Sequence, residues 1–248
     1  MLRFANPTLF LKLVRWLMPL AALTSALLLG WGLYLVFAVS PEDYQQGATV
    51  RIMYIHVPAA WLALSCYSLM ALSSIGSLVW KHPLADVSAK ALAPIGAAFT
   101  FLCLVTGALW GKPMWGTWWV WDARLTSVLV LFLVYCGIMA LWTAFDDPAR
   151  AARPVAILTL FGFINVPIVK FSVDWWNTLH QPASVFRMGG PSIDQSMLTP
   201  LFVMASGATA LMLALHLAGM RTEIMRRRVR NLSQQLARQD GLPAQSEE

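Results

Sequence analysis

Residues 125–145 read LTSVLVLFLVYCGIMALWTAF, and no charged side chain occurs in this stretch. Arg124 precedes it directly and Asp146 follows it directly, so charges stand only at its two ends. A helix of about 20 apolar residues is long enough to cross the hydrocarbon core of a bilayer. The stretch therefore predicts a membrane-spanning helix.

The same pattern occurs five more times along the chain. We expect the other spans at about residues 16–40, 57–80, 91–110, 154–172 and 196–220. The composition agrees, because 58% of the residues are hydrophobic and 12% are charged, whereas soluble proteins have about 25% charged residues. A β-barrel would show alternating strands of about ten residues instead. We predict an all-α integral membrane protein, a single membrane domain over residues 1–248 with six transmembrane helices.

Basic residues are distributed unevenly between the two sets of loops. Thirteen of the eighteen lysines and arginines lie in the N-terminal segment, in the loops after the second and fourth spans, and in the tail. Because Lys and Arg concentrate on the cytoplasmic side, we expect both termini to be cytoplasmic. Residues 221–248 would form a basic cytoplasmic tail whose first part continues the last helix. The expected contact of these charges is membrane lipid, and nothing in the sequence points to nucleic acid.

The segment before the 125–145 span is unusually rich in tryptophan. Residues 110–124 read WGKPMWGTWWVWDAR and hold five of the twelve tryptophans. Trp is enriched at the interfaces of any membrane protein, but the spacing here fits neither a helix face nor strand alternation. Two glycines and Pro113 interrupt the run. We therefore predict an outward-facing, tryptophan-rich loop that lies along the membrane surface.

Two of the four histidines are expected on the same outward side as this loop. His56 begins the second span, and His180 lies in the loop between the fifth and sixth spans. His82 and His216 fall at the inner side, where a structural role suffices. An ionisable residue at the membrane boundary is costly and so suggests a function, and imidazole is a common metal ligand. The pair predicts a metal-binding or cofactor-binding site at the outer face.

A zinc ion and a haem are the two groups that such a pair of imidazoles suggests. Zinc usually takes three or four protein ligands, and Asp122 and Asp174 lie in the same layer, so zinc stays open. Zinc has no use for the tryptophans, however, whereas a large flat ring stacks on indole faces. Two histidines can also ligate a haem iron from opposite sides. The haem propionates would need cations, and we favour Arg51 and Arg124 for that role.

Several segments together resemble the cytochrome c maturation protein C family. The segment 110–124 is similar to the tryptophan-rich "WWD" signature of haem-handling membrane proteins. The resemblance extends from about residue 43 to 181. The matching pieces, in chain order, are DYQQG, RIMYIHVPAA, APIGAAFTFLCLVTGALWGKPMWGTWWVWDARLTS, ALWTAFDD and DWWNTLHQ. The cytochrome c haem lyases share the signature on much longer chains, so the length here favours the smaller family.

This resemblance implies a function and a set of site residues. It implies that the protein binds haem b at the periplasmic face of the bacterial inner membrane and delivers it to the haem chaperone CcmE. The partners that it implies are the ATP-binding cassette pair CcmA and CcmB and the small protein CcmD. His56 and His180 would be the axial ligands. The signature residues that would handle the haem are Trp115, Trp118, Trp119, Trp121 and Asp122.

Two other functions remain as alternatives. A subunit that itself moves haem across the membrane would need polar or haem-sized features through its spans, which are mostly Leu, Ala, Val and Phe. A redox cytochrome b usually places histidine pairs deep within its helices, whereas both candidates here are expected at one surface. The sequence has no phosphate-binding Gly-Lys-Ser/Thr loop, so ATP hydrolysis would belong to a partner. Whether haem transfer makes this chain an enzyme stays open.

Overall fold

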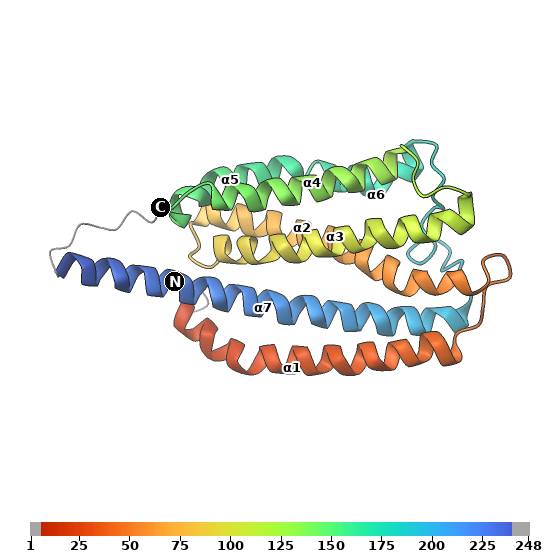
Figure 1. The fold of residues 1–248 in the computed structure, drawn as a ribbon, viewed down its shortest axis with the longest axis horizontal. Helices are drawn as coiled ribbons and strands as arrows, with labels where there is room; N and C mark the ends of the chain where they lie inside the picture. The colour runs from red at the N-terminus through yellow and green to blue at the C-terminus, as the bar shows by residue number, and fades with distance from the viewer. Residues whose placement is uncertain (1–5, 240–248) are drawn as a thin grey trace.

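The apolar segments form helices that are long enough to cross a membrane. In a computed structural model, which describes residues 6–239, six helical segments meet the length and composition of a membrane span (Figure 1). The elements are α1 (Pro7–Tyr34), the π-helical turn η2 (Leu35–Val39), the 3-10 helix η3 (Ala48–Ile52), α2 (Met53–Trp80), α3 (Ala85–Trp115), α4 (Ala123–Thr143), α5 (Pro148–Gly162), α6 (Asn165–Trp175) and α7 (Gln195–Gln239). The prediction of a helical chain with six helices long and apolar enough to span a membrane is confirmed.

The helices are arranged around a central pair. Helices α2 and α3 pack along each other, α1 and α7 pack together on one side of them, and α4, α5 and α6 lie on the other side (Figure 1). Helix α1 begins and α7 ends at the same end of this bundle. The opposite end carries three connecting segments: the one that joins η2 to η3, the tryptophan-rich one between α3 and α4, and the one between α6 and α7. These are the three segments that the sequence predicts to face outward.

The fifth span is broken into two shorter helices, which differs from the single helix expected over residues 154–172. Helix α5 ends at Gly162 and α6 begins at Asn165. Pro167 lies in the first turn of α6, where it has no N–H to donate and its ring excludes the carbonyl group four residues earlier. The side-chain amide of Asn165 donates to the carbonyl oxygen of Ser127 on α4 at 2.8 Å. The break is thus held against α4.

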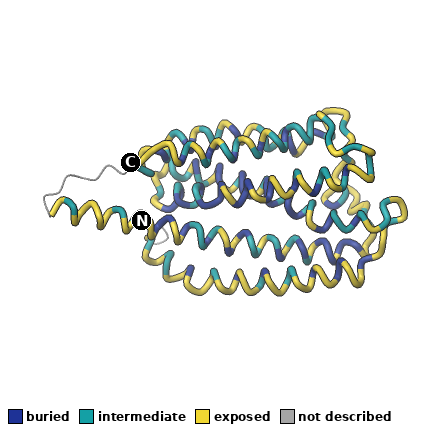
Figure 2. Tube along the Cα trace, in the orientation of Figure 1, coloured by how far each residue is buried: buried dark blue, intermediate teal, exposed yellow. Residues whose placement is uncertain are grey.

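The core lies where α2, α3 and α4 meet, and Figure 2 shows the most buried stretches there. Tyr67 and Tyr135 are completely buried. Their hydroxyl groups donate to the carbonyl oxygens of Thr159, at 3.1 Å, and Ala63, at 2.8 Å. Such bonds are required because a bilayer offers no water to an unpaired polar group. Gly96 on α3 admits the Tyr135 ring, since a Cβ there would overlap it.

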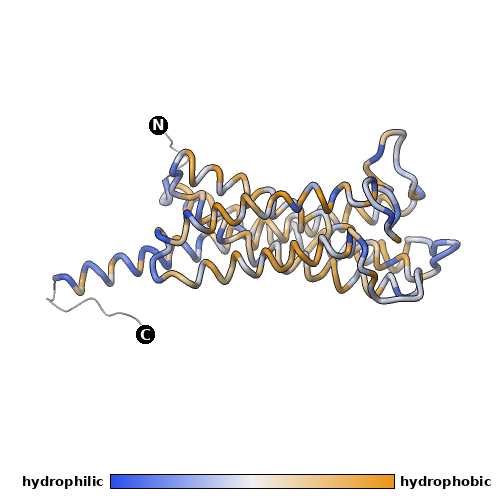
Figure 3. The backbone as a smooth tube through the Cα atoms, turned by 90° about the horizontal axis from the view of Figure 1, so that it is seen from above, coloured by the Kyte–Doolittle hydropathy of each residue, from blue (hydrophilic) through white to orange (hydrophobic). Residues whose placement is uncertain are grey.

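The last helix continues into the basic segment, as expected for residues 221–239. Apolar residues dominate the middle of the bundle, and polar residues gather at its two ends and on the projecting part of α7 (Figure 3). Arg227 pairs with Asp86 at 2.7 Å, and Lys90 pairs with Glu223 at 3.0 Å. These ion pairs join α7 to α3. Residues 240–248 of the predicted tail, and residues 1–5, lie outside the described residues.

The tryptophan-rich segment is helical in its first part, which the sequence reading does not anticipate. Helix α3 runs through Trp115 and ends at Gly116, whose φ of 74° is left-handed. The Gly116 N–H donates to the carbonyl oxygen of Lys112 at 3.0 Å and so closes the last turn. Residues 117–122 then form an irregular connection to α4. Pro113 lies in this final turn, where it has no N–H to donate to the carbonyl oxygen of Leu109.

Candidate functional site

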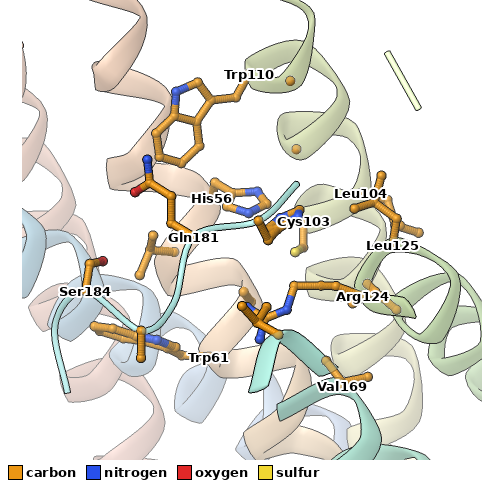
Figure 4. Close-up of a pocket in the computed structure, with 18 of the residues that line it drawn as sticks. His56, Trp61, Cys103, Leu104, Trp110, Arg124, Leu125, Val169, Gln181 and Ser184 are labelled. Carbon is orange, nitrogen blue, oxygen red and sulfur yellow. The ribbon is translucent and has the colours of Figure 1, made fainter. Parts of the chain in front are cut away.

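A cavity of about 310 Å³ lies at the end of the bundle that carries the three connecting segments. Its walls come from α2, α3, α4, α6 and the segment between α6 and α7, and most of them are apolar. Figure 4 shows His56 and Arg124 directed into this space between Trp110 and Trp61, with the chain at Gln181 crossing it. The volume is at the lower end of the range of small-molecule sites, about 300–1,000 Å³.

His56 enters the cavity from the first turn of α2. Its Nδ1 lies 3.0 Å from Oγ1 of Thr106 on α3. The indole of Trp110 meets the imidazole edge-on, with 5.7 Å between ring centroids and 74° between planes. Gly107 allows this close approach, because a Cβ there would lie 3.0 Å from Cε1 of His56. The other ring nitrogen, Nε2, makes no hydrogen bond within residues 6–239, so it is left for a ligand.

His180 reaches the same cavity from the segment between α6 and α7. Its ring packs on Trp115, with 5.0 Å between centroids. Its Nδ1 is buried and finds no hydrogen-bond partner in the described part of the chain. Burial lowers the pKa of His180 to about 4, and the positive charge of Arg124 acts in the same direction. The ring is therefore neutral near pH 7, the state in which imidazole binds a metal.

Asp122 connects the tryptophan-rich segment to the chain beside His180. One carboxylate oxygen accepts the N–H of Leu125 at 2.8 Å and caps the start of α4. The other accepts the N–H of Leu179 at 3.3 Å. Negative side chains are favoured at a helix N-terminus, so this acid is stabilised where it stands. It acts on the site through the backbone next to His180.

The structure brings some of the predicted site residues to the cavity and leaves others outside it. The residues that line the cavity are His56, His180, Trp115, Trp119 and Arg124. Those that do not line it are Arg51, Trp118, Trp121 and Asp122. Arg51 lies 3.9 Å from Glu42 instead. Trp118 and Trp121 are 53% and 76% exposed, so they face outward at this end of the bundle.

Other residues of the cavity are not among those predicted. Trp61 lines it from α2, and its ring centroid is 5.1 Å from that of Phe186. Trp61 follows His56 by five residues, a spacing that does not put two side chains on the same helix face, so helical periodicity could not identify it. Lys170 also lines the cavity, and a lysine within an apolar span was a signal in the sequence. Thr106 had none, since its contact with His56 depends on how α2 packs against α3.

The donor set does not suit a zinc ion. Among residues 6–239 there is no group of three or more His, Cys, Asp and Glu side chains that could hold a metal ion together. Zinc in proteins usually has at least three such ligands. Two histidines in an aromatic cavity agree better with a planar group that brings its own equatorial ligands.

Comparison with known proteins places the chain in a family. The sequence model described as "CcmC: Heme exporter protein C" matches residues 1–235. The chain belongs to the CcmC family. The heme exporter protein C of Bradyrhizobium diazoefficiens is 66% identical over 228 residues, which cover 92% of this chain and 86% of that protein. The family resemblance read from the sequence motifs is confirmed.

Two further CcmC relatives are similar over nearly the same length. The heme exporter protein C of Haemophilus influenzae is 47% identical over 223 residues, which cover 90% of this chain and 91% of that protein. That of Escherichia coli is also 47% identical over 223 residues, covering 90% of each chain. The CcmC match therefore includes the whole cavity and most of α7.

Proposed function

We propose that this CcmC-family chain binds haem b between His56 and His180 and delivers it to the haem chaperone CcmE during maturation of c-type cytochromes. One observation carries the proposal. Two histidines 124 residues apart in the sequence open on one aromatic cavity, and each has a ring nitrogen without a hydrogen bond in the part of the chain that is described. The relatives are named heme exporter proteins, which supports the same choice of ligand.

The residues of the cavity suit a haem. His56 and His180 would be its axial ligands, and the indoles of Trp110, Trp115 and Trp119 offer apolar faces to the ring. The Nε1–H of Trp119 is buried without an acceptor among the described residues and so could serve a polar edge. Bound haem supplies its own redox and vinyl chemistry, whereas the protein supplies position and electrostatics.

Cations in the cavity would meet the haem carboxylates. Arg124 and Lys170 both line the cavity. The Nε of Arg124 donates to the hydroxyl of Ser172 at 3.0 Å, and its Nη2 donates to the carbonyl oxygen of Lys170 at 3.3 Å. These bonds hold the guanidinium in place, and its Nη1 makes no hydrogen bond with residues 6–239. Arg is well suited to a carboxylate because it can form two parallel hydrogen bonds. Arg51 lies in η3 and pairs with Glu42 outside the cavity, so it becomes a second candidate only if η3 itself moves inward.

The proposed location is the periplasmic side of the bacterial inner membrane. The connecting segments that border the cavity lie at the end of the bundle opposite the projecting basic part of α7 (Figure 3), and the positive-inside rule puts that basic part in the cytoplasm. Trp118 and Trp121 are exposed beside the cavity, so we expect CcmE to dock there. CcmA, CcmB and CcmD would complete the complex, and CcmA would hydrolyse ATP.

The alternative functions find less support. A path for haem through this chain would have to pass the core below the cavity, where Met70, Tyr135 and Ile138 have no exposed surface. A cytochrome b that carries electrons across a membrane would need a second histidine pair at the other end. At that end, each histidine is already in contact with a protein group. His82 accepts the N–H of Leu84 at 3.2 Å, and His216 contacts the hydroxyl of Ser88 at 3.3 Å.

Haem content tests the proposal. The full chain and its His56→Ala and His180→Ala variants are purified from haem-replete cells, and haem per protein is read from the visible spectrum. The matched control is His216→Ala, which removes a partly buried histidine far from the cavity. We expect both cavity variants to lose most of their haem, added imidazole to restore part of it, and the control to keep it. Full haem in both cavity variants would contradict the proposal.

A further inference from the structure

The hydroxyl group of Thr106 lies beside one ring nitrogen of His56. Thr106 lies on α3 and is 8% exposed. Its Oγ1 is 3.0 Å from Nδ1 of His56. It is also 2.6 Å from the carbonyl oxygen of Leu102, one turn earlier in the same helix, and 3.3 Å from that of Cys103, whose backbone is a hydrogen-bond partner of His56 as well. The distances to Nδ1 and to Leu102 are those of hydrogen bonds. The direction of each bond therefore follows from the number of hydrogens available.

A hydroxyl group has one hydrogen to donate, and a backbone carbonyl oxygen can only accept. The bond to Leu102 therefore uses the hydrogen of Thr106. Oγ1 must then be the acceptor toward His56, so Nδ1 of His56 carries a hydrogen and donates it. A neutral imidazole with its hydrogen on Nδ1 has its lone pair on Nε2. Nε2 is thus the atom of His56 that can bind iron.

The packing around His56 opposes any other orientation of the ring. A Cβ at Gly107 would lie 3.0 Å from Cε1 of His56, so the backbone of α3 is close to one edge of the imidazole. Trp110 covers another part of the ring, edge-on at 5.7 Å. Turning the imidazole over would put a C–H group against Oγ1 of Thr106 and lose the hydrogen bond.

We propose that Thr106 is a positioning residue for haem binding, which accepts the Nδ1–H of His56 and thereby presents Nε2 to the iron. The inference rests on the proposed haem-binding role of His56. Loss of the hydrogen-bond partner of a metal-ligating histidine typically lowers metal affinity about 10- to 100-fold. His180 has no comparable support, since its Nδ1 is without a partner among residues 6–239.

Three variants isolate this contact. Thr106→Val keeps the shape of the side chain and removes the acceptor, whereas Thr106→Ser keeps the hydroxyl group. The matched control is Thr100→Val, because Thr100 is also buried on α3 and its hydroxyl donates to the carbonyl oxygen of Gly96 at 2.7 Å. Haem affinity is measured on the full-length protein by competition with apomyoglobin. The imidazole ¹⁵N chemical shifts of the haem-free protein report the tautomer of His56, assigned with His56→Ala.

We expect Thr106→Val to lower haem affinity about 10-fold or more and to change the ¹⁵N shifts of His56 from the Nδ1–H form to a mixture. Thr106→Ser and Thr100→Val should match the unmodified protein in both measurements. Equal behaviour of Thr106→Val and Thr100→Val would overturn the inference while leaving the proposed function intact. If His56→Ala itself retains haem, the proposed function fails, and the role of Thr106 toward haem fails with it.

Discussion

The imidazoles of His56 and His180 are held by different means. His56 lies on a helix, and its imidazole is hydrogen-bonded to the side chain of Thr106. His180 lies on an irregular segment. The neighbouring N–H of Leu179 donates a hydrogen bond to the carboxylate of Asp122. Side chains supported by helices and hydrogen bonds are positioned more accurately than those on loops. At the residue scale, the two ligands therefore depend on different neighbours.

Asp122→Asn separates the two roles of Asp122. Asn is as good a helix N-cap as Asp, and its single carbonyl oxygen can keep the bond to Leu125, but its amide group cannot accept from Leu179. We expect Asp122→Asn to unfold at an unchanged temperature and to retain less haem than the unmodified chain. Asp122→Ala should also lose about 1 kcal/mol of folding stability with the cap.

These effects are measured by thermal unfolding in detergent and by haem per protein. Haem retention by Asp122→Asn equal to that of the unmodified chain would show that the bond to Leu179 does not support His180.

At the scale of the elements, the end of α3 determines where the tryptophans lie. The helix carries Trp110 and Trp115 on its last turns, and the left-handed Gly116 then directs the chain toward Trp118 and Trp119. One part of the tryptophan-rich segment is thereby fixed to a helix and faces the cavity. The other part is free of regular structure and partly faces outward.

Gly116→Ala tests the importance of this helix end. A residue with a Cβ pays about 1–2 kcal/mol for left-handed backbone, so we expect Gly116→Ala to lower the free energy of unfolding by that amount and to reduce haem retention. The control is Gly137→Ala in the middle of α4, where a Cβ would meet nothing within 4 Å and Ala favours the helix.

Tryptophan fluorescence during thermal unfolding compares the two variants. Equal stability of Gly116→Ala and Gly137→Ala would contradict this prediction, because it would show that the left-handed backbone at residue 116 is not needed to end α3.

Much of this fold could be predicted from the sequence, because a bilayer imposes simple rules on length and charge. The spans, the helical continuation of α7 and the shared side of His56 and His180 all follow from apolar length and loop order. The break at Asn165 and the helical start of the tryptophan-rich segment could not be predicted in this way. The break depends on Pro167 together with the hydrogen bond from Asn165 to Ser127, and the helical start depends on where α3 ends, at Gly116. The contacts of Thr106 and Asp122 join residues 50 and 57 positions away, so only the packing of the helices shows them.

The whole molecule has its two chemical features at opposite ends. The cavity and the exposed tryptophans lie beside the connecting segments at one end of the bundle. The basic part of α7, which is joined to α3 by ion pairs, lies at the other end, and Figure 1 shows these two ends of the backbone. This separation agrees with a protein that meets a haem chaperone on one side of the membrane and remains anchored by its charges on the other.

Cysteine labelling tests the proposed orientation. Ser192 and Ser233 are both exposed. Ser192 lies in the segment before α7, and Ser233 lies on the projecting part of α7. With a maleimide that cannot cross membranes, we expect Ser192→Cys to be labelled in intact cells and Ser233→Cys only after lysis. The unmodified chain, whose three cysteines lie within helices that span the membrane, is the control for background. The reverse pattern of labelling would place the cavity in the cytoplasm.

The most direct test of the central claim is an electron density or cryo-EM map of the haem-loaded chain. We predict one haem in the cavity, with its iron bound by Nε2 of His56 on one side and by the ring of His180 on the other, and with its plane against Trp110, Trp115 or Trp119. A haem whose iron is bound by neither histidine, or one that lies elsewhere on the protein, would contradict this account.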